Sequence, residues 1–526
     1  MSGRIMGACT RNYLLERTRV SAAPQGERNY HSFYQLLAGT SAAELQLRKL
    51  KAPSHYTMLL PGGRSATQRP PNGPTGDGAG SSIAIEGVDD AHEWRVTSQA
   101  MEELGFSKEE HGAIVDILAA LLHLGSLEFA LDASVTNADD ASKLVDQRPA
   151  EEAAALLCVD RHSFVGALTG VRVRDMQASL SVDAAAKNRD AFVAAAYAAL
   201  FDWLVMRINH VGAHAADDLG SARYIGVLDI FGFEIFATNS LEQLCINFAN
   251  EKLQRNFTMT TFAQEEGLYD AEGIVFEHIP YADNLPVLEL LDCASPRRRG
   301  ILQLLDEEVR LPRTSDATLL AKMNGAFAPS TGMVPGKGGN HAAYEVDFRQ
   351  VGGQAGGLFT IKHYAGDVRY SISGFLEKSV ENISSELVGA LLASSNTLAA
   401  LLFQQTSARA NEHRAHGNGK AANGKAAPSG TRKPTVGVKF ASQLAALIEM
   451  IEATDAHFIR CIKPNATKAA AVFEAKLTLE QLRCVQPSST CDEHAASNST
   501  GVRPREGSDH DALLEMLCSH VSQTRF

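Results

Sequence analysis

The chain has 526 residues and a formal net charge of −12, with 45% hydrophobic and 21% charged residues. This composition is ordinary for a globular protein, and the length allows several subdomains. The negative net charge excludes the overall basic character that is typical of nucleic-acid-binding proteins. No apolar run approaches the roughly 20 residues that a membrane span needs, and residues 1–20 mix apolar and charged types, unlike a signal peptide. The eight cysteines form no CxxC pair and the 17 histidines no HExxH pattern, so we expect reduced thiols and no zinc site.

Three segments read as loops, and apolar periodicity predicts helices between them. The Gly/Pro/Ser-rich residues 61–82 read as a flexible insertion, and the glycine-rich residues 324–357 and the stretch 404–439 read as further loops. Ser107 and Glu110 form a capping box before the first helix. The core-facing stripes are Ile114, Ile117, Leu118 and Leu121; Val193, Ala196, Tyr197, Leu200 and Leu204; and Phe440, Leu444, Leu447, Ile448 and Ile451.

Two short apolar runs predict buried strands. One is Tyr224 to Leu228, and the other is His457 to Ile462, closed by Lys463-Pro464-Asn465. Both runs are apolar on both faces and are separated by helices, which suits the interior of a mostly parallel sheet.

The first of these runs ends in "DIFGFEIF", an acidic turn with a glycine. Ligands bind at the carboxyl ends of strands in open α/β sheets. Asp229 at that end could hold magnesium, directly or through water, and Gly232 would let its N–H approach a phosphate. An ordinary strand-to-helix turn with an acidic cap explains the same residues. Ser240 and Gln243 then form a capping box for a long helix. A long helix joined rigidly to a phosphate-sensing turn would act as a lever that transmits the ligand state.

The stretch "GVLDIFGFEIFATNSLEQLCINFANEKLQRNF" (226–257) resembles the switch II loop and relay helix of the myosin motor domain. Further stretches occur in the order that this family would have them. They are "NYLLERTRV" (12–20), "GERNYHSFYQLLAG" (26–39), "ILAALLHLGSLEF" (117–129), "LFDWLVMRIN" (200–209), "HYAGDVRYSISGFLEKS" (363–379) and "HFIRCIKPN" (457–465). The resemblance covers about residues 3 to 484.

The resemblance implies an α/β fold of the P-loop NTPase type, here with an incomplete, mostly parallel central sheet among helices and with upper and lower actin-binding subdomains. It divides the chain into five parts. Residues 1–225 would be a portion of the upper subdomain, and residues 226–403 would contain switch II, the relay helix and the lower subdomain. A basic loop (404–439) would be followed by an actin-binding helix and strand with the start of the reactive-thiol segment (440–484), and by a divergent tail (485–526) that we expect to be disordered.

By resemblance, ATP and magnesium are the cofactors. Asp229 would lie beside the magnesium and its waters, Gly232 would offer its N–H to the γ-phosphate, and Glu234 would pair with a switch I arginine. These are positioning roles, as phosphoryl transfer requires. The family places a GxxxxGK[ST] phosphate loop and switch I upstream of "NYLLERTRV", so we expect both to lie before Met1. The near match Gly419 to Ala426 ends in alanine and sits in a low-complexity loop.

These features lead us to expect a chain truncated at both ends, with no converter and no light-chain site, that is inactive as an ATPase alone. The truncation could come from the gene model or be a genuine short product. The predicted strands would lack sheet neighbours, which would make the isolated chain marginally stable or aggregation-prone.

Actin filaments are the partner that the resemblance implies. Residues 404–439 carry seven basic residues against Glu412, and the family places a loop that meets acidic actin here. This loop lacks aromatic residues for base stacking, which disfavours nucleic acid. Arg172 to Ala185 matches another actin-facing loop more loosely. The implied actin-binding residues are Arg432, Lys433, Lys439, Leu444, Leu447, Ile448, His457, Phe458, Ile459, Arg460 and Lys463.

Two functions follow from the sequence. The first is a fragment of a cytoplasmic actin-based motor, and the second is a non-catalytic actin-binding or non-functional product. The paired acids Asp306, Glu307 and Glu308 could suggest acid catalysis, but a solvated helix face explains them better.

Overall fold

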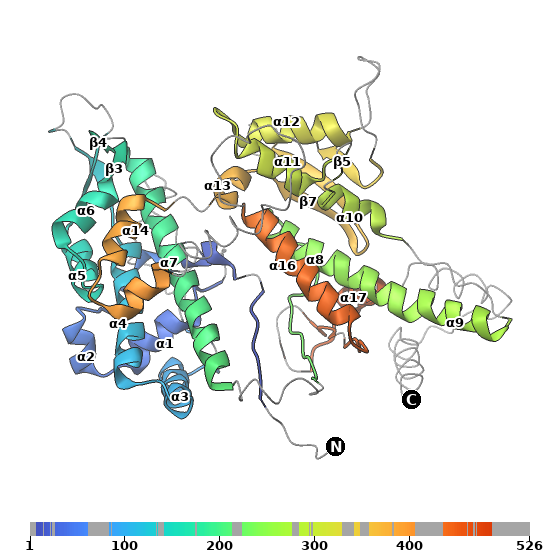
Figure 1. Cartoon of the computed structure of the whole chain (residues 1–526), viewed down its shortest axis with the longest axis horizontal. Coiled ribbons are helices and arrows are strands. Elements are labelled where there is room, and N and C mark those ends of the chain that lie inside the picture. The colour runs from blue at the N-terminus through green and yellow to red at the C-terminus, as the bar shows by residue number, and fades with distance from the viewer. Residues whose placement is uncertain are drawn as a thin grey trace, which may run out of the picture.

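Two hydrophobic cores organise the chain in the computed structural model, in which helices dominate and the sheets are small (Figure 1). The structure describes residues 7–13, 15–21, 23, 27–60, 84–85, 87–132, 134, 141–173, 176–212, 224–275, 283–293, 295, 298–328, 341–347, 357–380, 383–404, 435–459, 461–465, 469 and 471–485. The predicted insertion 61–82, the near phosphate-loop match and most of the basic loop lie outside these residues, as does the tail after Val485.

The first core is built mainly by the elements before residue 213. They are η1 (Arg17–Val20), α1 (His31–Gly39), α2 (Ala42–Leu47), η2 (Pro53–His55), η3 (Thr57–Leu59), α3 (Asp90–Glu103), α4 (Lys108–Gly125), β1 (Phe129–Leu131), β2 (Ser142–Leu144), α5 (Arg148–Leu156), α6 (Arg161–Thr169), β3 (Gly170–Val173), β4 (Met176–Ser179) and α7 (Val182–Gly212). The strands form two antiparallel pairs, β1 with β2 and β3 with β4. The loosely matched segment 172–185 therefore begins as one strand of a hairpin.

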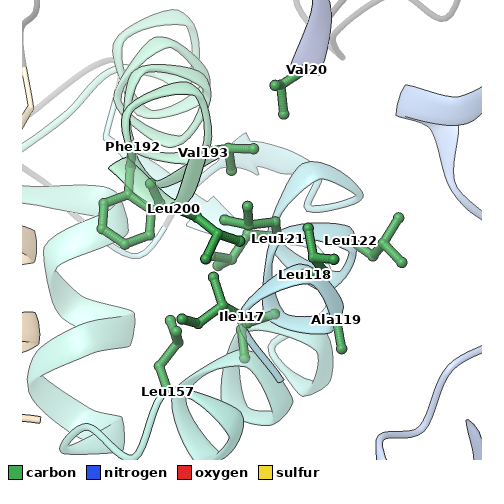
Figure 2. Packing of buried hydrophobic residues seen from close by; sticks show 14 of the residues in the cluster. Val20, Ile117, Leu118, Ala119, Leu121, Leu122, Leu157, Phe192, Val193 and Leu200 are labelled. Atoms are coloured by element: carbon green, nitrogen blue, oxygen red, sulfur yellow. The ribbon is translucent and has the colours of Figure 1, made fainter. Parts of the chain in front are cut away.

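Helix α4 lies at the centre of this core, and its capping box is confirmed. The backbone N–H of Glu110 donates to the Ser107 hydroxyl at 3.1 Å, and the Glu110 carboxylate accepts from the Ser107 N–H at 2.8 Å. Figure 2 shows Ile117 and Leu121 of α4 beside Leu200 of α7, and Leu118 and Phe192 belong to the same core. Both predicted stripes are thus core-facing, as the 3.6-residue period requires.

Helix α7 corrects one expectation about membrane spans. It has 31 residues and contains an 18-residue window of mean hydropathy 1.6, so by length and composition it could cross a membrane. Its inner face carries Phe192, Val193 and Trp203, which are buried in the first core. A long core helix passes the same compositional test, and one face of α7 does pack in the first core, although only 33% of the apolar window is buried.

The second core is built by the elements after residue 240. They are α8 (Leu241–Thr258), a π-helical turn (Met259–Ala263), α9 (Gln264–Glu272), α10 (Leu285–Leu291), α11 (Ile301–Glu308), α12 (Asp316–Phe327), β5 (Tyr344–Asp347), β6 (Leu358–His363), β7 (Gly366–Ser371), α13 (Phe375–Ser379) and α16 (Val436–Glu452), with α17 (Ala475–Val485) following. The three strands form one antiparallel sheet in the order β5-β6-β7. Helix α16 confirms the third predicted stripe, because Phe440, Leu444 and Leu447 are buried in this core.

The chain returns to the first core after building most of the second. Helix α14 (Ser385–Leu392) inserts Leu387 and Leu391 into the first core, and the ring of Phe403 stacks on that of Phe192 at 5.8 Å. Residues 226–403 therefore contribute to both cores. In Figure 1, α14 lies among the first-core helices.

The two predicted buried strands are wrong for this structure. Residues 224–230 are assigned no strand, and Ile225 and Val227 are 96% and 92% exposed. Residues 457–459 and 461–462 are also not strand, and Ile459 is 90% exposed. The expected parallel sheet is not formed by the described strands, whose one parallel pairing is the bridge between Asn239 and Tyr370. A strand is buried only when neighbours flank it, and an apolar pattern cannot supply those neighbours.

Close packing at Gly39 gives a test of the first core. A Cβ atom at Gly39 would overlap the buried side chain of Trp94, whereas a Cβ at Gly112 in α4 would meet nothing within 4 Å. We expect Gly39→Ala to lower stability by about 1–3 kcal/mol through overpacking. Gly112→Ala should be neutral or stabilise by up to about 1 kcal/mol, because alanine favours a helix interior. Thermal unfolding of both variants checks this, and equal effects would contradict it.

Candidate functional site

The turn that carries the predicted catalytic residues is an extended, exposed segment before α8. Asp229 and Gly232 are both exposed, and Asp229 has no hydrogen bond or ion pair with another described residue. A Cβ atom at Gly232 would meet nothing within 4 Å. Among the residues that the structure describes, neither Asp229 nor Gly232 meets a second polar side chain, and Gly232 makes no close approach that would require glycine.

The fit of magnesium can be judged from the donor set at Asp229. Magnesium prefers several oxygen ligands in near-octahedral geometry. Among the residues that the structure describes, no group of three His, Cys, Asp or Glu side chains could hold a metal ion. Asp229 supplies a single carboxylate, so the described residues do not form a magnesium site of their own.

Glu234 is the one predicted catalytic residue that the fold engages. Its side chain is half-buried, and its carboxylate lies 3.5 Å from the Gln243 amide nitrogen, at the edge of hydrogen-bonding distance. Burial raises the pKa of Glu234 above its ordinary value, the Gln243 contact lowers it, and the charges of Glu16 and Glu27 raise it further. No described cation forms an ion pair with this carboxylate, and the charge of Arg19 lowers its pKa only as the smallest of these effects. A cation supplied from elsewhere would relieve the cost of burying it.

Two asparagines of α8 hold the main chain of this turn, and sequence analysis missed both. The Asn247 side chain accepts from the Glu234 N–H and donates to the Glu234 carbonyl, both at 2.8 Å. Asn250 donates to the carbonyl of Phe231 at 3.0 Å. The spacing of three residues places both asparagines on one face of the helix. That spacing, within a helix that follows an acidic turn, is the signal that could have identified them.

The turn also contacts the hairpin formed by β6 and β7. The ring of Phe233 meets His363 and Tyr364 edge-on, with ring centroids 5.1 and 5.4 Å apart. His363 and Tyr364 begin the "HYAGDV" motif. The turn is thus held between α8 and this hairpin, and a shift of either element would move it.

The predicted actin-binding residues fall into three groups. Arg432, Lys433 and Arg460 lie outside the described residues. Leu444 and Leu447 are 2% and 4% exposed in the second core, so they anchor α16 and do not reach the surface of this structure. Lys439 and Ile448 are partly buried, Phe458 packs its ring against Phe257 at the end of α8 (5.0 Å), and His457, Ile459 and Lys463 are exposed.

The acids of α11 form ion pairs, and the expectation of a solvated helix face is wrong for Glu308, which is 5% exposed. Asp306 contacts Arg310 at 2.6 Å, Glu307 contacts Arg299, and Glu308 contacts Lys322 at 3.1 Å. Their carboxylates are thus neutralised locally, which agrees with a structural helix and not with acid catalysis.

The pKa of Glu234 gives a pH-dependent test. A raised carboxyl pKa means that folding disfavours the ionised form, so the charge lowers stability above the folded-state pKa and has no effect well below the ordinary value of 4.5. Glu234→Gln should therefore raise the melting temperature at pH 7 by about 1–2 °C and leave it unchanged near pH 3.

Glu110→Gln is the matched control with the opposite sign. Hydrogen bonds from Arg207 and from the Ser107 amide lower the pKa of Glu110. Its charge therefore stabilises the fold above the ordinary pKa, and its loss should lower the melting temperature at pH 7. Glutamine keeps the capping box, which removes helix capping as a cause. Shifts of the same sign in both variants at pH 7 would contradict this electrostatic account.

Comparison with known proteins places the whole arrangement in a family. The model of the myosin head (motor domain) family matches residues 1–487. Myosin-2 of Lachancea kluyveri is 37% identical over 491 residues, which cover 91% of this chain and 28% of that protein. Myosin-6 of Arabidopsis thaliana is 34% identical over 490 residues (92% and 28%), and the myosin-I heavy chain of Dictyostelium discoideum is 35% identical over 493 residues (91% and 18%). The chain spans less than a third of the length of these relatives, and it belongs to the myosin head motor-domain family, which has a P-loop NTPase fold.

Proposed function

We propose that this chain is the part of an actin-based motor that contains switch II, the relay helix and much of the actin-binding region. The whole motor would couple magnesium-ATP hydrolysis to movement along actin filaments in the cytoplasm. The observation that carries the proposal is the pair of hydrogen bonds from the Asn247 side chain to the N–H and the C=O of Glu234. These bonds connect the turn, which would sense phosphate, to α8, which would transmit the position of the turn. The division of the chain into subdomains that end at residues 225, 403, 439 and 484 is part of this proposal.

Actin contact is proposed for the surface that follows the basic segment. Leu444 and Leu447 anchor α16 in the second core, and the exposed His457, Ile459 and Lys463 follow its end. The basic residues of 404–439 would meet acidic actin first and steer the encounter, since dispersed charges act more on association than on tight binding.

Co-sedimentation of residues 1–526 with actin filaments tests the contact. We expect binding that weakens as salt is raised, because salt screens exposed charges. Replacing Arg432, Lys433 and Lys439 with alanine should weaken low-salt binding about threefold to tenfold and flatten its salt dependence. A control variant with Lys108, Lys143 and Arg148 replaced removes three exposed positive charges from the elements around the first core and should bind like the parent. Equal losses in both variants would contradict the proposed surface.

We also propose that residues 1–526 alone do not hydrolyse ATP. Asp229 is exposed and unpaired among the described residues, and no described cation forms an ion pair with Glu234. Phosphoryl transfer requires these groups to be held around the phosphates and the metal.

Phosphate release from the purified chain checks this second proposal. With magnesium and ATP we expect only the background rate, with and without actin filaments. A magnesium-dependent, actin-stimulated release that disappears in Glu234→Ala would contradict it. Actin binding without hydrolysis favours a non-catalytic actin-binding product over a working motor for this chain alone, and the absence of both activities favours a non-functional product.

A further inference from the structure

A row of polar side chains runs through the second core behind the turn. It begins at Asn247 on α8, continues through Tyr370 on β7 and His363 on β6, and ends at Glu251, one helical turn beyond Asn247 on α8. Asn247, Tyr370 and Glu251 are fully buried, and His363 is 7% exposed. Buried polar groups are costly unless each is hydrogen-bonded, so the contacts within this row determine whether the core tolerates it.

The direction of each hydrogen bond follows from its neighbour. Asn247 uses its oxygen to accept from the Glu234 N–H, so its nitrogen faces the Tyr370 hydroxyl, to which it donates at 2.9 Å. The Tyr370 hydroxyl is then free to donate its proton to Nε2 of His363, also at 2.9 Å. His363 therefore carries its proton on Nδ1, which donates to Glu251 Oε1 at 2.9 Å.

Glu251, at the end of the row, has further hydrogen-bond partners. The Glu251 carboxylate also accepts from the Tyr364 N–H at 3.0 Å and from the Asn284 side chain at 2.5 Å. Asn284 occupies the N-cap position of α10, and its side chain, which makes no capping hydrogen bond there, also donates to the Glu251 carbonyl at 2.8 Å. Burial raises the pKa of Tyr370, which keeps its hydroxyl protonated and able to donate. The row therefore connects the turn, α8, both strands of the hairpin and α10.

We propose that this row, Asn247, Tyr370, His363 and Glu251, is a positioning device that sets the main chain at Glu234 relative to α8 and the hairpin. It acts on the backbone and not on the Glu234 carboxylate, because Asn247 holds the N–H and the C=O of that residue. Tyr370, His363 and Glu251 act through Asn247 and touch no reacting group. Their importance for phosphate sensing rests on the proposed function, whereas the positioning itself rests on the contacts alone.

Hydrogen exchange of the Glu234 amide is the direct readout, measured on the 526-residue chain by mass spectrometry of peptides that cover residues 231–239. Tyr370→Phe removes one hydroxyl and leaves the Asn247 nitrogen and His363 Nε2 short of a partner. We expect exchange in this peptide to become about tenfold faster or more, since a buried unsatisfied group is expensive. Exchange in α11, residues 301–308, should change little.

Tyr344→Phe is the matched control. Tyr344 is also a buried tyrosine of the same sheet, and its ring stacks on Phe359 as that of Tyr370 does. Its hydroxyl donates to Asn324 of α12 and has no path to Glu234. This variant should leave exchange in residues 231–239 unchanged. Equal acceleration by both variants, or equal acceleration of α11 in Tyr370→Phe, would overturn the proposal in favour of general destabilisation.

A double variant separates positioning from loss of stability. Asn247→Ala removes the acceptor of the Glu234 N–H, so it should accelerate exchange at least as much as Tyr370→Phe. Adding Tyr370→Phe to Asn247→Ala should give little further acceleration at residues 231–239, because the hydrogen bonds of the row reach the Glu234 main chain through Asn247. If the accelerations of exchange in the two single variants multiplied in the double variant, the two substitutions would destabilise the turn independently, and the proposal would be wrong. None of these readouts depends on ATP or actin, so failure here is distinct from failure of the proposed function.

Discussion

The burial of α8 is the constraint on which the second half of the structure depends. This helix buries apolar residues such as Leu244 and Phe248 together with Asn247 and Glu251, which are fully buried. The apolar side chains require a core around them, and the polar ones require partners at defined positions within that core. The sheet of β5, β6 and β7, the start of α10 and the preceding turn supply those partners. The position of the sheet, of the start of α10 and of the turn is therefore tied to a buried polar group on α8 that needs a hydrogen-bond partner.

The helices were predictable because their signal is local. The capping box at Ser107 and the stripes on α4, α7 and α16 each lie within a few turns of chain, and burial of one face follows from the period alone. The family was predictable for a related reason: the stretch from Gly226 to Phe257 is long and specific, and the family model covers residues 1–487.

The strands and the clasp on the turn could not be read from the sequence in the same way. Val227 and Ile459 have the composition of buried strands, yet burial of a strand depends on neighbours far along the chain, and both side chains are exposed. Asn247 was missed because a polar residue inside an apolar helix usually faces solvent. Its hydrogen bonds to the Glu234 main chain establish its role. Leu444 was assigned to a partner surface by resemblance, but its side chain is buried in the second core and does not reach the surface.

The return of residues 385–403 to the first core has a consequence for synthesis on the ribosome. Phe192 is made early, but Phe403, which stacks on it, leaves the ribosome some 200 residues later, after α8 to α13. The first core therefore has a hole while most of the second core is being made, and its apolar lining at Ile117 and Leu121 stays accessible to chaperones until Leu391 and Phe403 arrive. The order of emergence favours early folding of the second core's inner helices as an insertion, with closure of the first core as a late, long-range event.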